Sequence, residues 1–267
     1  MKIRARQVIL VVAALLALSL ASTPASAESG ATVGNRPTII LVHGAFSGPT
    51  AWDQVVAGLQ KEGYSTVTPT LGLASIDGDV AIVRSTLDGI SGDKILVGHS
   101  YGGIVISNAA AGRTDVLGFV FTAAFVPAEG DSIASLGVGY APPSFLAPGH
   151  LVFNPFPFAT IDPAFFREDF AQDLNPKLAG ALATAQGATS LAILTDTSGP
   201  VAWGDITSWY ALSGADRVID PALQLFMARR AGSQIVQFDD ASHAGGFTHY
   251  QARFVRLIEQ AVRSTTG

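Results

Sequence analysis

The stretch Gly98-His99-Ser100-Tyr101-Gly102-Gly103 decides how the rest of the chain is interpreted. It follows the apolar run at residues 94–97, which predicts a short buried strand, and precedes residues 104–110, which predict a helix start. A Gly-x-Ser-x-Gly pattern between a strand and a helix predicts a sharp turn with Ser100 at its tip in a left-handed conformation. Gly98 and Gly102 suit such a turn because side chains there would collide across it. In a chain with 28 glycines the same pattern can also be an ordinary turn. The rest of the sequence is needed to choose between the two interpretations.

Short apolar runs recur along the chain and alternate with segments of helical periodicity. Strands that alternate with helices indicate a parallel sheet with right-handed connections. The sequence therefore predicts an α/β fold, with a mostly parallel sheet flanked by helices. The predicted strands are residues 38–42, 65–68, 94–97, 116–122, 208–212 and 234–238, and the predicted helices include residues 79–90 and 249–263.

The alternation stops between about residues 126 and 206, in a segment rich in proline and phenylalanine. Asp162-Pro163 and Asn175-Pro176 each place a capping residue before proline, which predicts the starts of two short helices. An insertion of this length is typical of a cap over the carboxyl ends of the strands, where ligands bind in this architecture. We therefore expect a helical cap before the strand at residues 208–212, with a few of its aromatic side chains lining a pocket.

The first 27 residues have the pattern of a secretion signal peptide. A basic start precedes an apolar run over residues 8–20, and Ala25-Ser26-Ala27 forms a small-x-small cleavage site. The prediction is one domain at residues 28–267, secreted or periplasmic, with no stable membrane anchor after signal removal. The alternative is that the segment is retained as an N-terminal anchor.

Composition excludes several classes of function. The chain has no cysteine, which excludes disulfides, a thiol nucleophile and thiolate metal sites. The formal net charge of −5 is spread without runs, so the sequence offers no basic patch for nucleic acid or a membrane surface. The five histidines show no metal-binding spacing and no dinucleotide fingerprint appears, so we expect neither a metal nor a cofactor.

Three residues at strand ends form a candidate catalytic set. Acyl transfer through serine needs a base to accept the hydroxyl proton and a carboxylate to orient that base. Ser100 follows the strand at residues 94–97, Asp216 follows the strand at 208–212, and His243 lies beyond the last strand. Because the carboxyl ends of parallel strands meet at one edge of a sheet, these three side chains are expected to converge.

Other residues compete for the roles of base and acid. His43 also follows a strand, but we interpret it as positioning the loop that contains it. His99 lies inside the turn and cannot act as the base on Ser100, and His249 is expected at the start of the last helix. Asp220 competes with Asp216, but Pro221 after it predicts a helix cap. His243 and Asp216 are therefore preferred.

An oxyanion would be held by backbone N–H groups. One donor is predicted at Tyr101, directly after the nucleophile. The second is expected from the loop after residues 38–42, at Ala45 with Phe46 as the alternative. The residues expected to line a substrate pocket are Phe46, Trp52, Phe125, Trp203 and Phe247.

With these motifs the sequence resembles the α/β-hydrolase superfamily over nearly all of residues 28–267. Within it the chain is most similar to the branch of plant methylesterases, hydroxynitrile lyases and their bacterial esterase relatives. The resemblance rests on residues 41–46 (Leu-Val-His-Gly-Ala-Phe) with Trp52 and on residues 97–103. It extends to the strand leading to Asp216 and to Ser242-His243. It implies the α/β-hydrolase fold, with the cap inserted before the strand that carries the catalytic acid.

The resemblance also indicates the type of reaction. Hydroxynitrile lyases of this branch carry a threonine at the position of Gly44 and a lysine directly after the catalytic histidine, where this chain has Ala244. The resemblance therefore implies a serine hydrolase that cleaves a small-molecule ester or lactone. The alternatives are a cofactor-free lyase or perhydrolase on the same residues, and a non-catalytic relative that only binds its ligand.

Overall fold

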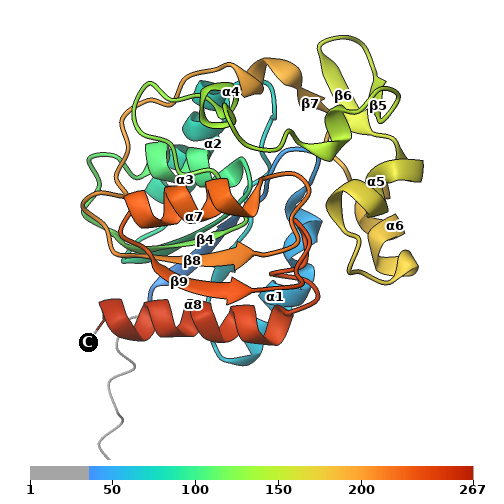
Figure 1. The fold of residues 1–267 in the computed structure, drawn as a ribbon. Helices are drawn as coiled ribbons and strands as arrows, with labels where there is room; N and C mark the ends of the chain where they lie inside the picture. Colours follow the sequence, from blue (N-terminus) through green and yellow to red (C-terminus); the bar gives the residue numbers. More distant parts are fainter. Residues whose placement is uncertain (1–35, 267) are drawn as a thin grey trace, which may run out of the picture. The chain divides into compact units, whose positions relative to one another are not determined.

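The computed structural model describes residues 36–266 (Figure 1). The predicted signal peptide at residues 1–27 lies outside them. A six-stranded sheet forms the centre of the described part, and every neighbouring pair in it is parallel. In spatial order the strands are β2 (Thr66–Val67), β1 (Thr38–Val42), β3 (Lys94–His99), β4 (Val116–Thr122), β8 (Ser208–Ser213) and β9 (Gln234–Phe238).

Helices cover both faces of this sheet, as Figure 1 shows. Two lie on one face and pack against each other, namely α1 (Asp53–Lys61), which follows the short 3-10 helix η1 (Pro49–Trp52), and α8 (Gln251–Thr265). On the other face lie α2 (Ile76–Asp88), α3 (Gly102–Ala109) and α7 (Pro221–Arg230). With both faces covered, β1, β3 and β4 are apolar and buried along almost their whole length.

The predicted strands are all present, and the helices differ from prediction only at their ends. The second helix begins at Ile76 and not at Asp79, because Ser75 caps it by accepting a hydrogen bond from Gly78 N at 3.2 Å. The last helix begins at Gln251, two residues later than predicted. Its buried Phe254, Ile258 and Ala261 lie on one face at helical spacing, and this face packs on the sheet.

The segment between β4 and β8 holds the two predicted helices and also a small sheet that the sequence analysis did not predict. Asp162 caps α5 (Pro163–Phe170) through Ala164 N, and Asn175 caps α6 (Pro176–Thr184) through Leu178 N. The sheet is antiparallel, so the insertion is not purely helical. Its remaining elements are α4 (Ile133–Leu136), η2 (Ser144–Leu146), β5 (Leu151–Phe153), β6 (Phe158–Ile161), β7 (Thr189–Ser190) and η3 (Leu191–Leu194).

Candidate active site

Ser100 occupies a tight turn between β3 and α3. Its φ is +54°, which confirms the predicted left-handed conformation, and its carbonyl accepts hydrogen bonds from Gly103 N (3.0 Å) and Phe125 N (3.1 Å). The turn is possible because Gly102 has no side chain, since a Cβ there would lie 2.5 Å from the carbonyl oxygen of Val42. The local sequence thus places Ser100 in the turn before α3, at the carboxyl edge of the sheet.

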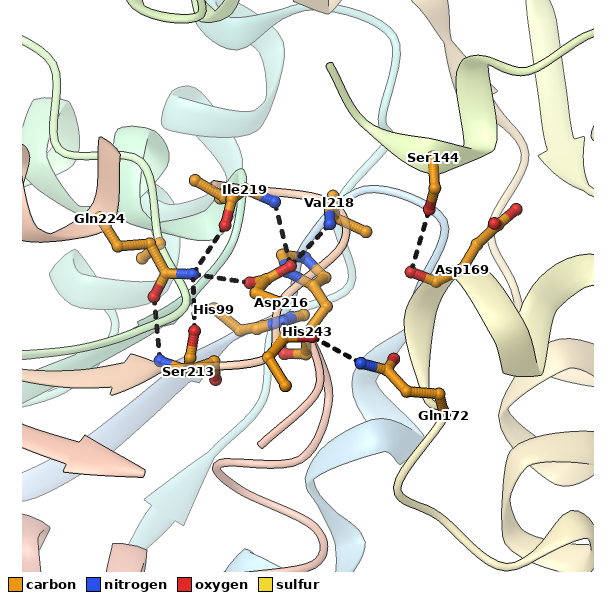
Figure 2. Close-up of polar contacts among 12 residues, drawn as sticks. His99, Ser144, Asp169, Gln172, Ser213, Asp216, Val218, Ile219, Gln224 and His243 are labelled. Carbon is orange, nitrogen blue, oxygen red and sulfur yellow. Dashed lines mark hydrogen bonds and ion pairs between the residues drawn. The ribbon is translucent and has the colours of Figure 1, made fainter. Parts of the chain in front are cut away.

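Asp216 and His243 meet at this edge, although 27 residues separate them. Asp216 Oδ2 lies 2.8 Å from His243 Nδ1, and both side chains are fully buried (Figure 2). The other carboxylate oxygen, Oδ1, accepts hydrogen bonds from the backbone N–H groups of Val218 (2.7 Å) and Ile219 (3.0 Å). These contacts fix the carboxylate, and the carboxylate fixes the orientation of the imidazole.

Gln224 is a further residue of this network that the sequence analysis missed. From helix α7, its Nε2 donates to Asp216 Oδ2 at 2.8 Å and to the Ile219 carbonyl at 2.9 Å, while its Oε1 accepts from Ser213 N at 3.0 Å (Figure 2). Its side chain is completely buried, which is rare for glutamine. No sequence motif marks this residue, although its partners lie only 5 to 11 residues before it, because the contacts form only when α7 packs on β8.

The second ring nitrogen of His243, Nε2, is buried and has no hydrogen-bond partner within residues 36–266, Ser100 included. The ring of Phe170, from α5, packs edge-on against this imidazole at 4.6 Å between centroids. The loop that carries His243 is held by His99, whose Nε2 donates to the His243 carbonyl at 3.0 Å. Burial lowers the pKa of His99 well below its usual value, so this neighbour of Ser100 is a neutral donor.

The backbone N–H groups of Ala45 and Tyr101, which line the same cavity as Ser100, have no acceptor within the described residues. The alternative donor at Phe46 is engaged, because Phe46 N donates to Thr189 Oγ1 at 2.8 Å. This contact favours Ala45 over Phe46. Gly44 allows the Ala45 loop to approach Ser100 closely, since a Cβ at Gly44 would lie 2.7 Å from Ser100 Cβ.

One short segment, residues 71–73, braces both of these N–H groups. Its Leu71 N donates to His43 Nε2 at 3.1 Å, and His43 Nδ1 donates to the Gly44 carbonyl at 2.9 Å, directly before Ala45. Burial lowers the pKa of His43, which suits this neutral, singly protonated ring. His43 therefore lies where the sequence analysis placed it, as a support of its own loop.

The same segment is tied to Tyr101 through Asp79, a second residue that the sequence analysis missed. The Tyr101 hydroxyl donates to Asp79 Oδ2 at 2.8 Å, and Asp79 Oδ1 accepts from Gly72 N at 2.6 Å and from Leu73 N at 3.2 Å. Burial and the Asp79 carboxylate raise the pKa of Tyr101, so the hydroxyl stays protonated and donates a hydrogen bond. The apolar positions of α2 predict only an amphipathic helix, and Asp79 stands at the predicted start of that helix.

A cavity of about 30 Å³ opens on Ser100, and its lining is almost entirely apolar. Two of the predicted pocket residues, Phe46 and Phe125, line it, together with aromatic side chains from the insertion. The full lining consists of Ala45, Phe46, Ser100, Tyr101, Phe125, Ile133, Pro143, Phe145, Phe170, Ile193, Leu194 and Val218.

The other three residues expected in a pocket, Trp52, Trp203 and Phe247, do not line this cavity, and their side chains pack elsewhere. Trp52 is completely buried in the core against Phe247, whose ring centroid lies 4.7 Å from those of both Trp52 and His99. Trp203 donates from its indole nitrogen to the Pro127 carbonyl at 2.6 Å. Aromatic character alone could not separate core residues from pocket residues.

Asp220 is the N-cap of α7 and accepts from Ala222 N at 2.8 Å, as its proline partner indicated. Within residues 36–266, no group of three His, Asp or Glu residues could hold a metal ion. In the same part of the chain, no helix is both long and apolar enough to cross a bilayer.

The fold and the strand-end residues define a class of protein, and a family comparison identifies it. The model of the alpha/beta hydrolase family matches residues 39–257, so the chain belongs to this family. A carbendazim hydrolyzing esterase of Nocardioides sp. (strain SG-4G) is 35% identical over 121 residues, which cover 40% of this chain and 50% of that esterase. The match thus spans only half of that relative's length.

Solved structures share the fold over nearly their whole length. A pyrethroid hydrolase from Sphingobium faniae JZ-2 has a TM-score of 0.71 at 21% identity, covering 85% of this chain and 97% of that one. The methylesterase MES16 from Arabidopsis has a TM-score of 0.68 at 18% identity, covering 84% and 98%. At these identities the structural likeness establishes the α/β-hydrolase fold alone.

Proposed function

We propose that this protein is an exported serine hydrolase that cleaves a carboxylic ester or lactone of a small-to-medium apolar substrate. The observation that carries the proposal is the buried pair of Asp216 and His243, in which Nδ1 is bound to the carboxylate and Nε2 is left without a partner. An imidazole held in this way has the free nitrogen that a general base needs. Export rests on the signal-peptide pattern at residues 1–27.

In the proposed reaction, Ser100 Oγ attacks the ester carbonyl carbon and His243 Nε2 accepts its proton. The carbonyl oxygen becomes an oxyanion, which the N–H groups of Ala45 and Tyr101 stabilise by hydrogen bonds. His243 then gives the proton to the leaving alcohol, and the C–O bond breaks to leave an acyl group on Ser100. Water repeats the cycle, with His243 again acting as base, to release the acid and restore the serine.

Asp216 orients His243 and stabilises its protonated form during each step. Hydrogen bonds from Val218, Ile219 and Gln224 hold this carboxylate, so the imidazole has little freedom to turn away. His243 Nε2 makes no hydrogen bond to Ser100 in the unliganded site. Catalytic hydrogen bonds often form or shorten only when substrate binds, so we expect this bond in the substrate complex.

Two features support a neutral ester as the substrate. The cavity at Ser100 has no charged side chain in its lining, so an ionic acyl group would lose its hydration without compensation. The relatives include a carbendazim hydrolyzing esterase, a pyrethroid hydrolase and a methylesterase. Gly44 and Ala244, which replace the threonine and lysine of hydroxynitrile lyases, favour hydrolysis over the lyase reaction.

The test is covalent labelling combined with substitution of the nucleophile. A fluorophosphonate should form one adduct on Ser100, and Ser100→Ala should abolish it. The same substitution should reduce kcat for p-nitrophenyl esters by roughly 10⁴-fold or more and leave the melting temperature nearly unchanged. Ser107→Ala, a substitution within α3, serves as the control that should keep the label. Labelling that persists in Ser100→Ala would refute the assignment.

A further inference from the structure

A second, larger cavity adjoins the one at Ser100. Its volume is about 230 Å³, and it is lined by α4, by η2 with the segment before it, and by the start of α7. Its lining includes Ala134, Tyr140, Leu146 and Leu223, none of which lines the cavity at Ser100. None of these four residues has a role in the proposed reaction at Ser100.

The two cavities share a boundary made of apolar side chains. Phe125, Ile133, Pro143, Leu194 and Val218 line both of them. These five residues come from the segment after β4, from the insertion and from the loop after Asp216, so the boundary joins the catalytic edge of the sheet to the insertion. A group bonded to an ester carbonyl at Ser100 would therefore have to pass along these side chains to reach the larger cavity.

The size of the first cavity requires such a route for any substrate beyond the smallest. A volume of about 30 Å³ accepts only a few atoms, whereas small-molecule sites typically measure roughly 300–1,000 Å³. The second cavity supplies most of the missing volume, and it shares five lining residues with the cavity at Ser100.

The chemistry of the second cavity selects an uncharged group. No lysine, arginine or histidine lines it, so an anion would find no partner there. Its one carboxylate, Asp220, has both oxygens engaged by backbone N–H groups, those of Ala222 at 2.8 Å and Ala141 at 3.0 Å. Most of the other lining side chains are aliphatic or aromatic, which favours burial of a hydrocarbon group.

We propose that the second cavity binds the larger, uncharged apolar group of the ester whose carbonyl is attacked by Ser100. This inference rests on the proposed function for the position of the carbonyl. The apolar group can belong to the acyl part or to the alcohol part of the ester, and two substrate series distinguish these sources. One series is p-nitrophenyl esters from acetate to decanoate, and the other is alkyl acetates from methyl to decyl.

The test variant is Ala134→Trp, which places an indole in the second cavity from an exposed position of α4. Its matched control is Val138→Trp, because Val138 is 77% exposed and lines neither cavity. In the wild-type protein kcat/KM should rise with chain length in one of the two series. The readout is the selectivity within that series, which is kcat/KM for the eight-carbon ester divided by kcat/KM for the shortest ester. Ala134→Trp should reduce this selectivity by at least about ten-fold, and Val138→Trp should leave it as in the wild type.

A binding measurement separates this proposal from the proposed function. Calorimetric titration of 1-octanol into the Ser100→Ala protein reads occupancy of the cavity without turnover. Adding Ala134→Trp should weaken that binding at least about ten-fold, and adding Val138→Trp should not. Equal octanol affinities in the two double variants, or equal chain-length profiles in the two single variants, would overturn the inference. Failure of the proposed function would appear instead as absence of a fluorophosphonate adduct on Ser100.

Discussion

The backbone and the side chain of Tyr101 have different contacts at the carboxyl edge of the sheet. Its backbone N–H is a free donor beside Ser100, while its hydroxyl donates to the buried Asp79 carboxylate. Asp79 also accepts hydrogen bonds from Gly72 and Leu73, so the residue after Ser100 is anchored to a segment far from it in sequence. The position of the N–H thus depends on a side-chain contact.

We expect Tyr101→Phe to lower the free energy of unfolding by about 1.5–3 kcal/mol, because it removes a donor from a buried carboxylate. The kcat for a p-nitrophenyl ester should fall more than KM rises, since the proposed role of the Tyr101 N–H is to stabilise the oxyanion and not the bound ester. Urea unfolding and steady-state kinetics measure the two effects.

The partner variant and a control complete this test. In a double-mutant cycle with Asp79→Asn, the two substitutions should couple by about 0.5–3 kcal/mol. Tyr64→Phe is the matched control, because the Tyr64 ring lies under Arg36 and away from the site, and it should change stability by less than about 0.5 kcal/mol. The interpretation is wrong if Tyr101→Phe behaves like Tyr64→Phe.

Among the elements, the short strand β7 connects the insertion to the loops at the carboxyl edge of the central sheet. Thr189 Oγ1 accepts from Phe46 N at 2.8 Å, and Ser190 N donates to the Leu73 carbonyl at 2.8 Å. Gly187 N, just before the strand, donates to the Ser47 carbonyl at 3.1 Å. The insertion therefore holds the loop after β1 as well as covering the pocket.

Removal of one of these contacts should affect both stability and rate. Thr189→Val keeps the shape of the side chain but leaves the buried Phe46 N–H without an acceptor, which should cost about 1–3 kcal/mol in the free energy of unfolding. Because Ala45 precedes Phe46, kcat for a p-nitrophenyl ester should also fall. Thr195→Val, at an exposed position of the same insertion, is the control. Equal melting temperatures and rates in the two variants would contradict this role of β7.

The same elements show how far the sequence could predict the fold. The strands of the central sheet are continuous apolar runs, and helices of clear periodicity separate them, so their order and type follow from local pattern. The sheet β5–β6–β7 was missed because its strands have only three, four and two residues and no alternating pattern. They form because the insertion packs on itself, and no local signal marks them.

On the scale of the whole molecule, two buried histidines make stability depend on pH. Burial lowers the pKa of both His43 and His99, whereas in the unfolded chain both titrate near 6.5. Below about pH 6.5 the unfolded state therefore binds more protons than the folded state. Linkage then requires the free energy of unfolding to fall as the pH drops below this value toward the lowered pKa values, and to be fully retained above it.

We expect the melting temperature to decrease between pH 7.5 and pH 5.5, as measured by calorimetry. His99→Gln removes one of the two groups and should make this decrease smaller. His249→Gln, at an exposed position, should keep the wild-type dependence. An identical slope in all three proteins would show that His99 is not the source.

The sequence by itself determined the central sheet, the turn at Ser100 and the order of Ser100, Asp216 and His243 along the chain. The apolar runs that form strands are local, and so are the glycines that permit the tight turn at Ser100. The carboxyl ends of parallel strands must lie at one edge of the sheet, so the strand-end residues follow from the same pattern. Only the tertiary structure decided the supports of the site. Phe46 N is engaged by Thr189, 143 residues away. Gln224 meets Asp216 because α7 packs on β8, and Asp79 meets Tyr101 because α2 packs on α3. Such contacts depend on which side chains the folded chain brings within hydrogen-bond distance, and no local pattern encodes that distance.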